Sequence, residues 1–520
     1  MPTLNKRNFP PLPSQRTKRQ RQRTTSNRED RSKNVGSTAT IDDLPDELIL
    51  DILDWLPDIA TSGISRVQPT QIRTVVLPTL ASISLTNHRF HRIVKDKLYM
   101  TYHSCFCEPY LFLRTMITNP ELAVLVRRVE FDILVPLDED EDREQYAATA
   151  KDKKTIKEGI KALNIPNWKD WATDCNSAGD SREALQTAIM MHTPNIDFLR
   201  VAGSIDRQSP PRWTGLIRQA TSGNSFGNTH KFRHVRSVRV AACVSTIQQL
   251  APLFLLQSLR ELYLNRMVDS YQVRGTSMLQ RLIPPLCNNL ETLNLEDSFL
   301  HTDELGVLVA SSRGLKSFKY DLTVSYFGYG VETVVELGPT TLITVLERQK
   351  STLESLQFRH DATDGEVYDF ANLRGSLKGF AVLRQLSCPL NVIFDSQLKS
   401  PSALIETLPS SIVDFHVFDS DYKPDERFIN ALEHLAMYGH VDVPLLKEVR
   451  VQGAMWATRD KKRLFALFVE AGIAFSVMDD ESSDIWGDNS TDSTQSSDEV
   501  DLYSDDDDDD DGSNMELVQF

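Results

Sequence analysis

A short hydrophobic pattern recurs through the middle of the chain and limits the folds that the chain can adopt. The unit reads apolar, two variable residues, apolar, one variable residue, apolar, as in Leu259, Leu262 and Leu264. Further clear copies begin at Leu290 and Leu353, and weaker ones begin at Val235, Leu315, Leu383, Ile412 and Leu446. Two outlying copies begin at Val126 and Ile196. From Val235 onward the copies start 24 to 38 residues apart, which is the spacing of a structural repeat.

Each copy predicts a strand, and the stretches between copies predict helices. The last two apolar positions alternate with a polar one, which is the period of a strand with one buried face. Helix-like stretches between the copies are Ser245–Gln257, Thr302–Ser311, Thr340–Lys350 and Pro424–Tyr438. We therefore expect an α/β domain over residues 120–475. The region Asp138–Asp180 fits neither pattern and is expected to be an inserted, partly exposed segment.

This alternation of strand and helix resembles a leucine-rich-repeat solenoid, in which each repeat buries its apolar face only against its neighbours. Repeats of that family usually carry Asn or Cys three residues after the last apolar position. Here the corresponding residues are Met267, Ser298, Thr323, Asp361, Asn391 and Ser420. The resemblance therefore implies an irregular solenoid that lacks most of the buried polar ladder. An ordinary α/β domain with several parallel strands is the alternative.

A solenoid presents one ordered row of outward side chains along its strands. These side chains stand between the last two apolar positions of each copy. The candidate surface for a protein substrate is Arg239, Tyr263, Asn294, Lys319, Gln357, Ser387, His416 and Arg450. The row mixes basic, polar and aromatic groups, as protein-binding surfaces do.

The stretch Leu44–Pro57 (LPDELILDILDWLP) predicts an amphipathic helix. Pro45 suits a first helical turn because its fixed φ is helical and its missing N–H costs no hydrogen bond there. Asp46 and Glu47 suit the positive end of the helix dipole. The apolar face follows helical spacing through Leu44, Leu48, Ile49, Ile52, Leu53 and Leu56. A second apolar pattern covers Leu80–Tyr99.

Together these two segments resemble an F-box, the small helical module that docks a Skp-type adaptor. The resemblance rests on LPDELILDIL at residues 44–53 and SLTNHRFHRI at residues 84–93, with Phe90 where the family usually has Trp. It implies an all-helical F-box at residues 41–100 with an insertion at about residues 57–77. The adaptor-binding positions that it implies are Leu44, Pro45, Glu47, Leu48, Ile52, Leu53, Leu56 and Leu85. An amphipathic hairpin packed on its own domain is the alternative.

Charge is concentrated at the two ends of the chain, although the net charge is −16. Residues 1–40 hold ten Lys or Arg against two acidic residues, whereas residues 479–520 hold seventeen acidic residues and no Lys or Arg. Low apolar content predicts a disordered basic arm at 1–40 and a disordered acidic tail at 479–520. The run Lys18–Arg23 is a nuclear-import patch, a weak nucleic-acid contact or a solvated basic arm. The acidic tail would repel nucleic acid, so a nucleic-acid partner is not expected.

No apolar run in the sequence approaches the length of a membrane span, and no hydrophobic segment follows the N-terminal charges. We therefore expect an intracellular protein, in the nucleus or the cytoplasm, without a membrane partner. The six cysteines are scattered and are expected to be reduced thiols.

No catalytic constellation stands out in the sequence, which has no P-loop, GxSxG or HExxH motif. The nearest approach to a metal-binding cluster lacks the paired spacing of zinc sites and consists of His88, His91, His103, Cys105 and Cys107. We therefore expect neither a metal nor a cofactor, and no catalytic residue.

The order of the two modules predicts a substrate-recognition subunit of a Skp/cullin/F-box ubiquitin ligase. Its partners would be a Skp-type adaptor, the cullin scaffold and a protein substrate that the sequence does not identify. The alternative is a leucine-rich scaffold that binds a nuclear partner and has no role in ubiquitination, with Leu44–Tyr99 serving only as a helical cap. An enzyme with a site dispersed over the fold ranks third.

Overall fold

The computed structural model describes residues 41–56, 69–104, 107–131, 146–177, 181–203, 210–223, 226–267, 276–298, 300, 302–323, 342–361, 377–389, 401–418, 426–452 and 456–478. The predicted basic arm, the predicted acidic tail and the acidic run at residues 138–142 lie outside the described residues.

The chain divides into two compact units, Met1–Val94 and Lys95–Phe520. The described elements of the first unit are η1 (Ile41–Asp43), α1 (Asp46–Asp54), α3 (Pro69–Ser84) and the first part of α4 (His88–Met100). The apolar pattern Leu80–Tyr99 is thus divided between two helices. The break falls before α4, where the Asn87 side chain accepts a 2.9 Å hydrogen bond from the Phe90 N–H, as an N-cap does. Helix α3 begins at Pro69, within the predicted insertion at about residues 57–77.

The second unit is built on one twelve-stranded sheet whose strands follow one another in chain order. All neighbouring strands are parallel. The strands are β1 (Thr101–His103), β2 (Arg128–Phe131), β3 (Phe198–Gly203), β4 (Ser237–Ser245), β5 (Glu261–Met267), β6 (Thr292–Glu296), β7 (Ser317–Thr323), β8 (Ser355–Asp361), β9 (Gln385–Pro389), β10 (Asp414–Phe418), β11 (Glu448–Gln452) and β12 (Ala474–Met478). The predicted α/β class is confirmed.

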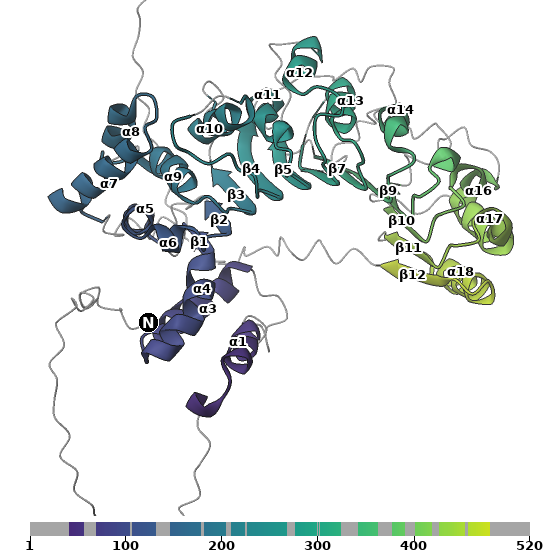
Figure 1. Ribbon diagram of the computed structural model, residues 1–520. Helices are drawn as coiled ribbons and strands as arrows, with labels where there is room; N and C mark the ends of the chain where they lie inside the picture. Colours follow the sequence, from purple (N-terminus) through teal and green to yellow (C-terminus); the bar gives the residue numbers. More distant parts are fainter. Residues whose placement is uncertain are drawn as a thin grey trace, which may run out of the picture. The chain divides into compact units, whose positions relative to one another are not determined.

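Helices connect the strands and lie on one side of the sheet, on the outer side of the arc that the strands form (Figure 1). Parallel crossovers are right-handed, so a sheet that always advances in one direction collects its helices on one face. A doubly wound sheet would instead reverse its strand order and cover both faces. The connecting helices are α5 (Pro109–Thr118), α6 (Pro120–Ala123), α7 (Ala150–Ala162), α8 (Trp168–Asp174), α9 (Ser181–His192), α10 (Arg212–Thr221), α11 (Ile247–Leu250), η2 (Ala251–Leu255), α12 (Thr276–Leu282), α13 (Thr302–Ser311), α14 (Leu342–Leu346), η3 (Glu347–Gln349), η4 (Leu377–Gly379), α16 (Ala403–Thr407), α17 (Glu426–Asp442) and α18 (Thr458–Glu470).

All ten predicted copies of the hydrophobic unit coincide with strands β2 to β11. In each copy the first apolar residue lies just before the strand and is buried, as Leu259 and Leu290 show. The sheet also extends beyond the predicted range of 120–475, to β1 and β12. The pattern did not identify these two strands because each lacks one apolar position of the unit. Ser104 occupies the last apolar position in the β1 copy, and Gly472 occupies the first in the β12 copy.

The stretches predicted to be helical do contain helices, but not all of these are continuous α-helices. One predicted helix, Thr302–Ser311, has the bounds of α13. By contrast, Ser245–Gln257 forms only α11 and the 3-10 turn η2, which carries Pro252 near its start. Residues 146–177 of the predicted inserted segment form the ordered helices α7 and α8, whose Ile156, Ile160 and Ala172 are buried in the core. That part of the segment is therefore packed structure.

Polar side chains inside the core join neighbouring repeats. The Ser298 hydroxyl accepts a 3.1 Å bond from the Met267 N–H of the preceding repeat and donates to the Glu296 carbonyl at 2.7 Å. The buried amide of Gln349 donates to the carbonyls of Val309 and Ser312, both at 3.0 Å, and accepts from the Leu315 N–H at 3.1 Å. The contacts of Ser298 and Gln349 thus link neighbouring segments one at a time. The sequence had not predicted a regular buried polar ladder.

Candidate protein-binding surfaces

The eight residues predicted to line a binding surface occupy a single row of the sheet. Strand register pairs each with the next, from β4 to β11. The row runs through Arg239, Tyr263, Asn294, Lys319, Gln357, Ser387, His416 and Arg450. Successive side chains of a strand point to opposite faces, so this row lies opposite the buried positions that pack under the helices. We call this side of the sheet the open face.

The row continues at both ends beyond the predicted residues. Arg200, Glu130 and His103 extend it through β3, β2 and β1, and Ser476 extends it into β12. Arg200 and Glu130 were missed although they occupy the same position in the two outlying copies, so the repeat signal contained them.

One end of the open face combines guanidinium groups with aromatic rings. The Arg128 guanidinium lies 3.8 Å from the centroid of the Phe198 ring, and that of Arg239 lies 4.5 Å from the centroid of Tyr263. Such cation–π contacts attract the guanidinium groups to the aromatic rings of the neighbouring strands. Phe198 precedes the row position in its own strand by two residues, so only the strand period could have revealed it.

A buried carboxylate organises the charge at the same end. Glu130 is 1% exposed and accepts a 2.7 Å hydrogen bond from Arg128 Nε, while Arg200 Nη1 lies 3.9 Å from its second oxygen. A carboxylate removed from water requires such partners. Arg128, Arg200 and Arg239 outnumber this carboxylate, so this end of the face has a positive character.

The middle of the open face is acidic. Glu296 accepts hydrogen bonds from Lys319 Nζ at 2.8 Å and from the Asn294 amide at 3.0 Å. Burial alone would raise the pKa of Glu296, but the bond and charge of Lys319 outweigh it and lower the pKa. Burial raises the pKa of the nearby Asp321. Asn294 is 9% exposed and its amide is held against Glu296, whereas Lys319 remains partly exposed.

The C-terminal part of the row carries an ion pair and a histidine. Arg450 forms a two-point ion pair with Glu448 at 2.8 and 2.9 Å, and His416 Nδ1 lies 3.2 Å from the Ser387 hydroxyl. Burial, followed by the charges of Arg450 and Arg359, lowers the pKa of His416 to about 4. His416 is therefore neutral at pH 7.

In the first unit, α1 divides its apolar residues between a buried and an exposed side. Ile49 and Leu53 are buried, whereas Leu48 is 47% exposed and Ile52 is 45% exposed. Of the other predicted adaptor positions, Pro45, Glu47 and Leu85 are exposed, and Leu44 and Leu56 are half-buried. Trp55, which the apolar pattern did not include, is 63% exposed on the same side of the helix as Leu48 and Ile52.

An ion-pair cluster fixes α1 within the first unit. Asp46, at the start of α1, binds Arg89 Nη2 at 2.8 Å and Arg92 Nη2 at 2.7 Å, both from α4. Arg89 also donates to the Leu44 carbonyl. The hydrogen bonds from Arg89 and Arg92 hold the pKa of Asp46 below its usual value. From sequence, Asp46 was assigned only to the helix dipole, and its partners lie too far along the chain to be paired by spacing.

The described residues hold neither a metal-binding cluster nor a membrane-spanning helix. No group of three or more His, Cys, Asp or Glu there has a geometry that could hold a metal ion. Within the same residues, every helix is too short or too polar to cross a membrane. His88 and His91 lie in α4 and His103 in β1, and Cys105 is outside the described residues.

Comparison with known proteins does not identify a family for this chain. No protein-family model matches the chain, and no curated protein is similar to it in sequence.

Proposed function

We propose that this chain is the substrate-recognition subunit of a Skp/cullin/F-box ubiquitin ligase. In this proposal the first unit is an F-box that docks a Skp-type adaptor, and the second is an irregular leucine-rich-repeat-like solenoid that holds a target protein. The observation that carries the proposal is the exposed apolar side of α1, formed by Leu48, Ile52 and Trp55. A helix in water gains little by exposing three large apolar side chains together unless a partner covers them.

The open face of the sheet supports the second half of the proposal. It carries side chains from every strand in one continuous row, with cationic and aromatic groups at one end and a carboxylate cluster in the middle. Arginine and tyrosine are enriched where proteins bind proteins, because each offers a large contact area and a polar group.

The mechanism would be proximity. A receptor that holds an adaptor at one unit and a target at the other raises the effective concentration of a target lysine near the ubiquitin-conjugating enzyme. No bond is made or broken by this chain. The cullin scaffold would be recruited through the adaptor.

The test of the adaptor contact is co-purification of the full chain with a Skp-type adaptor. Leu48→Asp combined with Ile52→Asp should abolish recovery of the adaptor, since a charge would be buried in an apolar contact. Asp51→Ala, on an exposed position of the same helix, is the matched control and should keep it. If wild-type protein recovers no adaptor, the proposal fails.

The same double variant separates the proposal from the scaffold alternative. A receptor should keep a folded repeat domain after the substitutions, with an unchanged urea midpoint of the main transition. A helical cap should lose it, because the charges would enter the domain core. Unfolding of the second unit by this variant would therefore favour the scaffold.

The target surface is tested by affinity purification and mass spectrometry, with and without proteasome inhibition. Arg239→Ala combined with Tyr263→Ala should remove the proteins that accumulate on wild-type bait under inhibition. Arg236→Ala, an exposed arginine just before β4, serves as the control and should retain them. Equal recovery by both variants would exclude this part of the open face.

A further inference from the structure

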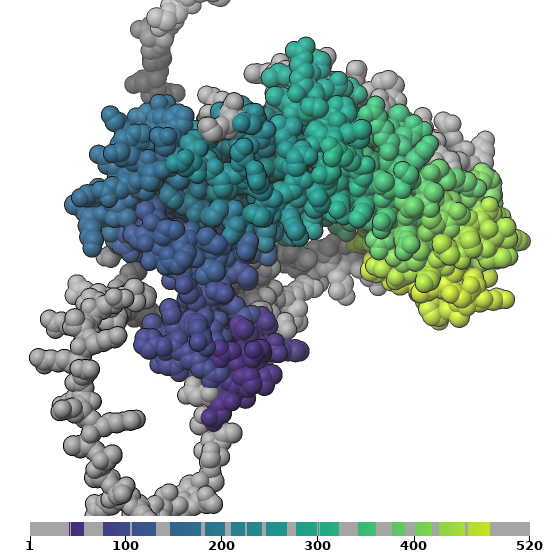
Figure 2. Space-filling model, in the orientation of Figure 1, coloured from purple at the N-terminus to yellow at the C-terminus, as the bar shows by residue number. Residues whose placement is uncertain are grey.

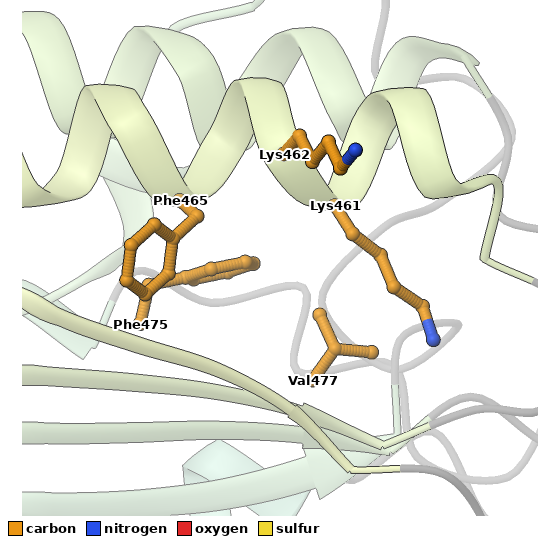
Figure 3. A pocket seen from close by; sticks show the side chains of 5 residues that line it. All are labelled: Lys461, Lys462, Phe465, Phe475 and Val477. Atoms are coloured by element: carbon orange, nitrogen blue, oxygen red, sulfur yellow. The ribbon is translucent and has the colours of Figure 1, made fainter.

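The C-terminal end of the sheet carries an apolar groove between its last helix and its last strand. The groove has a volume of about 440 Å³ and is lined by Lys461, Lys462 and Phe465 of α18 and by Phe475 and Val477 of β12 (Figure 3). Both elements lie at the surface at the yellow end of the second unit (Figure 2). None of these residues belongs to the open-face row or to the first unit.

Apolar side chains line the groove at the edge of the sheet, where a further strand and helix would have packed. Phe475 and Val477 continue the buried rows of Val449 and Val451 by register. Phe475 also stacks on Phe468, with ring centroids 4.9 Å apart. The packing of α18 leaves Phe475 only 7% exposed, whereas Val477 is half-buried. Among the described residues no strand follows β12 in the sheet, so no further strand and helix cover the rest of the groove, as they would in the interior of a solenoid.

The outer side of α18 shows the same incompleteness. Leu464 and Phe468 are fully buried, while Phe465 is 55% exposed and Val469 is 56% exposed. Phe465 and Val469 lie four residues apart, so they form one stripe along the helix, and Lys461 extends that stripe by one turn. An end repeat usually turns a polar face to water, and an exposed strand edge beside apolar side chains invites pairing.

Charge and chain length identify what would cover this groove. Lys461 and Lys462 place two positive charges at the groove, and residues 479–520 carry seventeen acidic residues with no Lys or Arg. The only tryptophan in that segment, Trp486, follows Ile485 and is flanked by Asp484 and Asp488. The seven steps from Met478 to Ile485 span up to roughly 24 Å of extended chain, enough to turn back along β12.

We propose that the segment 479–488 of this chain (DDESSDIWGD) caps the end of the sheet by docking in the groove. Ile485 and Trp486 pack against Phe465, Phe475 and Val477, and the flanking carboxylates lie near Lys461 and Lys462. The inference does not depend on the proposed ligase function.

The test is hydrogen exchange of the full chain, followed on peptides that cover β12 and α18. Ile485→Ser combined with Trp486→Ser should increase exchange in β12 at least about tenfold, because the strand edge and the groove lose their cover. Lys461→Glu combined with Lys462→Glu should produce an increase in β12 of the same kind. Replacing Asp505–Asp511 by serines is the control for tail charge and should leave β12 unchanged.

Other occupants give distinguishable results, and each would overturn the proposal. If a second copy covers the groove, exchange in β12 will depend on protein concentration and not on Trp486. If the end of the chain covers it, deletion of residues 512–520 will expose β12 while the Ile485/Trp486 variant will not. If exchange in β12 is equal in all variants at all concentrations, nothing docks in the groove.

Discussion

The row of buried side chains beneath the open face should carry most of the stability of the second unit, and Leu262 is a sharp place to test this. Leu262 is fully buried in β5 and pairs in register with Val238 and Leu293. Leu262→Ala removes three carbon groups, worth about 0.8 kcal/mol each in transfer free energy, or about 2.4 kcal/mol. The cavity left behind adds to this, so we expect a loss of about 3 to 5 kcal/mol in the free energy of unfolding.

The assay is urea unfolding of the full chain followed by far-UV circular dichroism. The midpoint of the main transition should fall clearly for Leu262→Ala, while Glu261→Ala, the preceding residue on the open face, should stay within about 0.5 kcal/mol of wild type. Because β5 pairs directly with β4 and β6 in the sheet, hydrogen exchange should rise first in β4 and β6 and last in β11. A loss below 1 kcal/mol, or an equal loss for Glu261→Ala, would refute the assignment of the two faces.

Three further predictions follow from particular contacts. Asp46→Asn should speed hydrogen exchange in α1 several-fold, because Arg89 and Arg92 lose their shared carboxylate, and Asp51→Asn on the same helix should not. Gln349→Leu should cost about 3 kcal/mol by leaving the Leu315 N–H and the Val309 and Ser312 carbonyls unpaired, whereas Gln357→Leu on the open face should cost little; equal urea midpoints would contradict this. The pKa values of His416 and His192 are lowered to about 4, in both cases chiefly by burial, so the unfolded chain takes up protons first and the free energy of unfolding should fall as pH drops from about 6.5 towards 5. The fall should be on the order of 1 kcal/mol per histidine after allowance for solvent screening, and it should shrink when both are replaced by glutamine.

The strands and the shared row could be predicted from sequence because both follow from a local period. A buried face repeats every second residue, and the copies at Leu259, Leu290 and Leu353 satisfy this without help from distant residues. The connecting helices were less predictable, since a segment such as Ser245–Gln257 is held by packing and needs no regular helix of its own. The contacts that fix side chains across the chain were not predictable at all. Nothing local joins Asp46 to Arg89, or Gln349 to Val309, because such pairs meet only after the fold exists.

The apolar stripe on α1 is wider than one packed face requires, and this width bears on the proposed adaptor contact. At 100° per residue, the apolar residues between Leu44 and Leu56 cover about half of the helix circumference. This is more than the roughly 100° that one packed face requires. The structure divides this stripe in angular order. Ile49 and Leu53 form its buried edge, and Leu48 and Ile52 lie towards the other edge, where Trp55 is also exposed. The buried edge packs within the first unit, and the exposed edge is the side on which the proposed adaptor would dock. Two partners on adjoining sides of one helix, its own unit and the proposed adaptor, would account for the full width of the stripe.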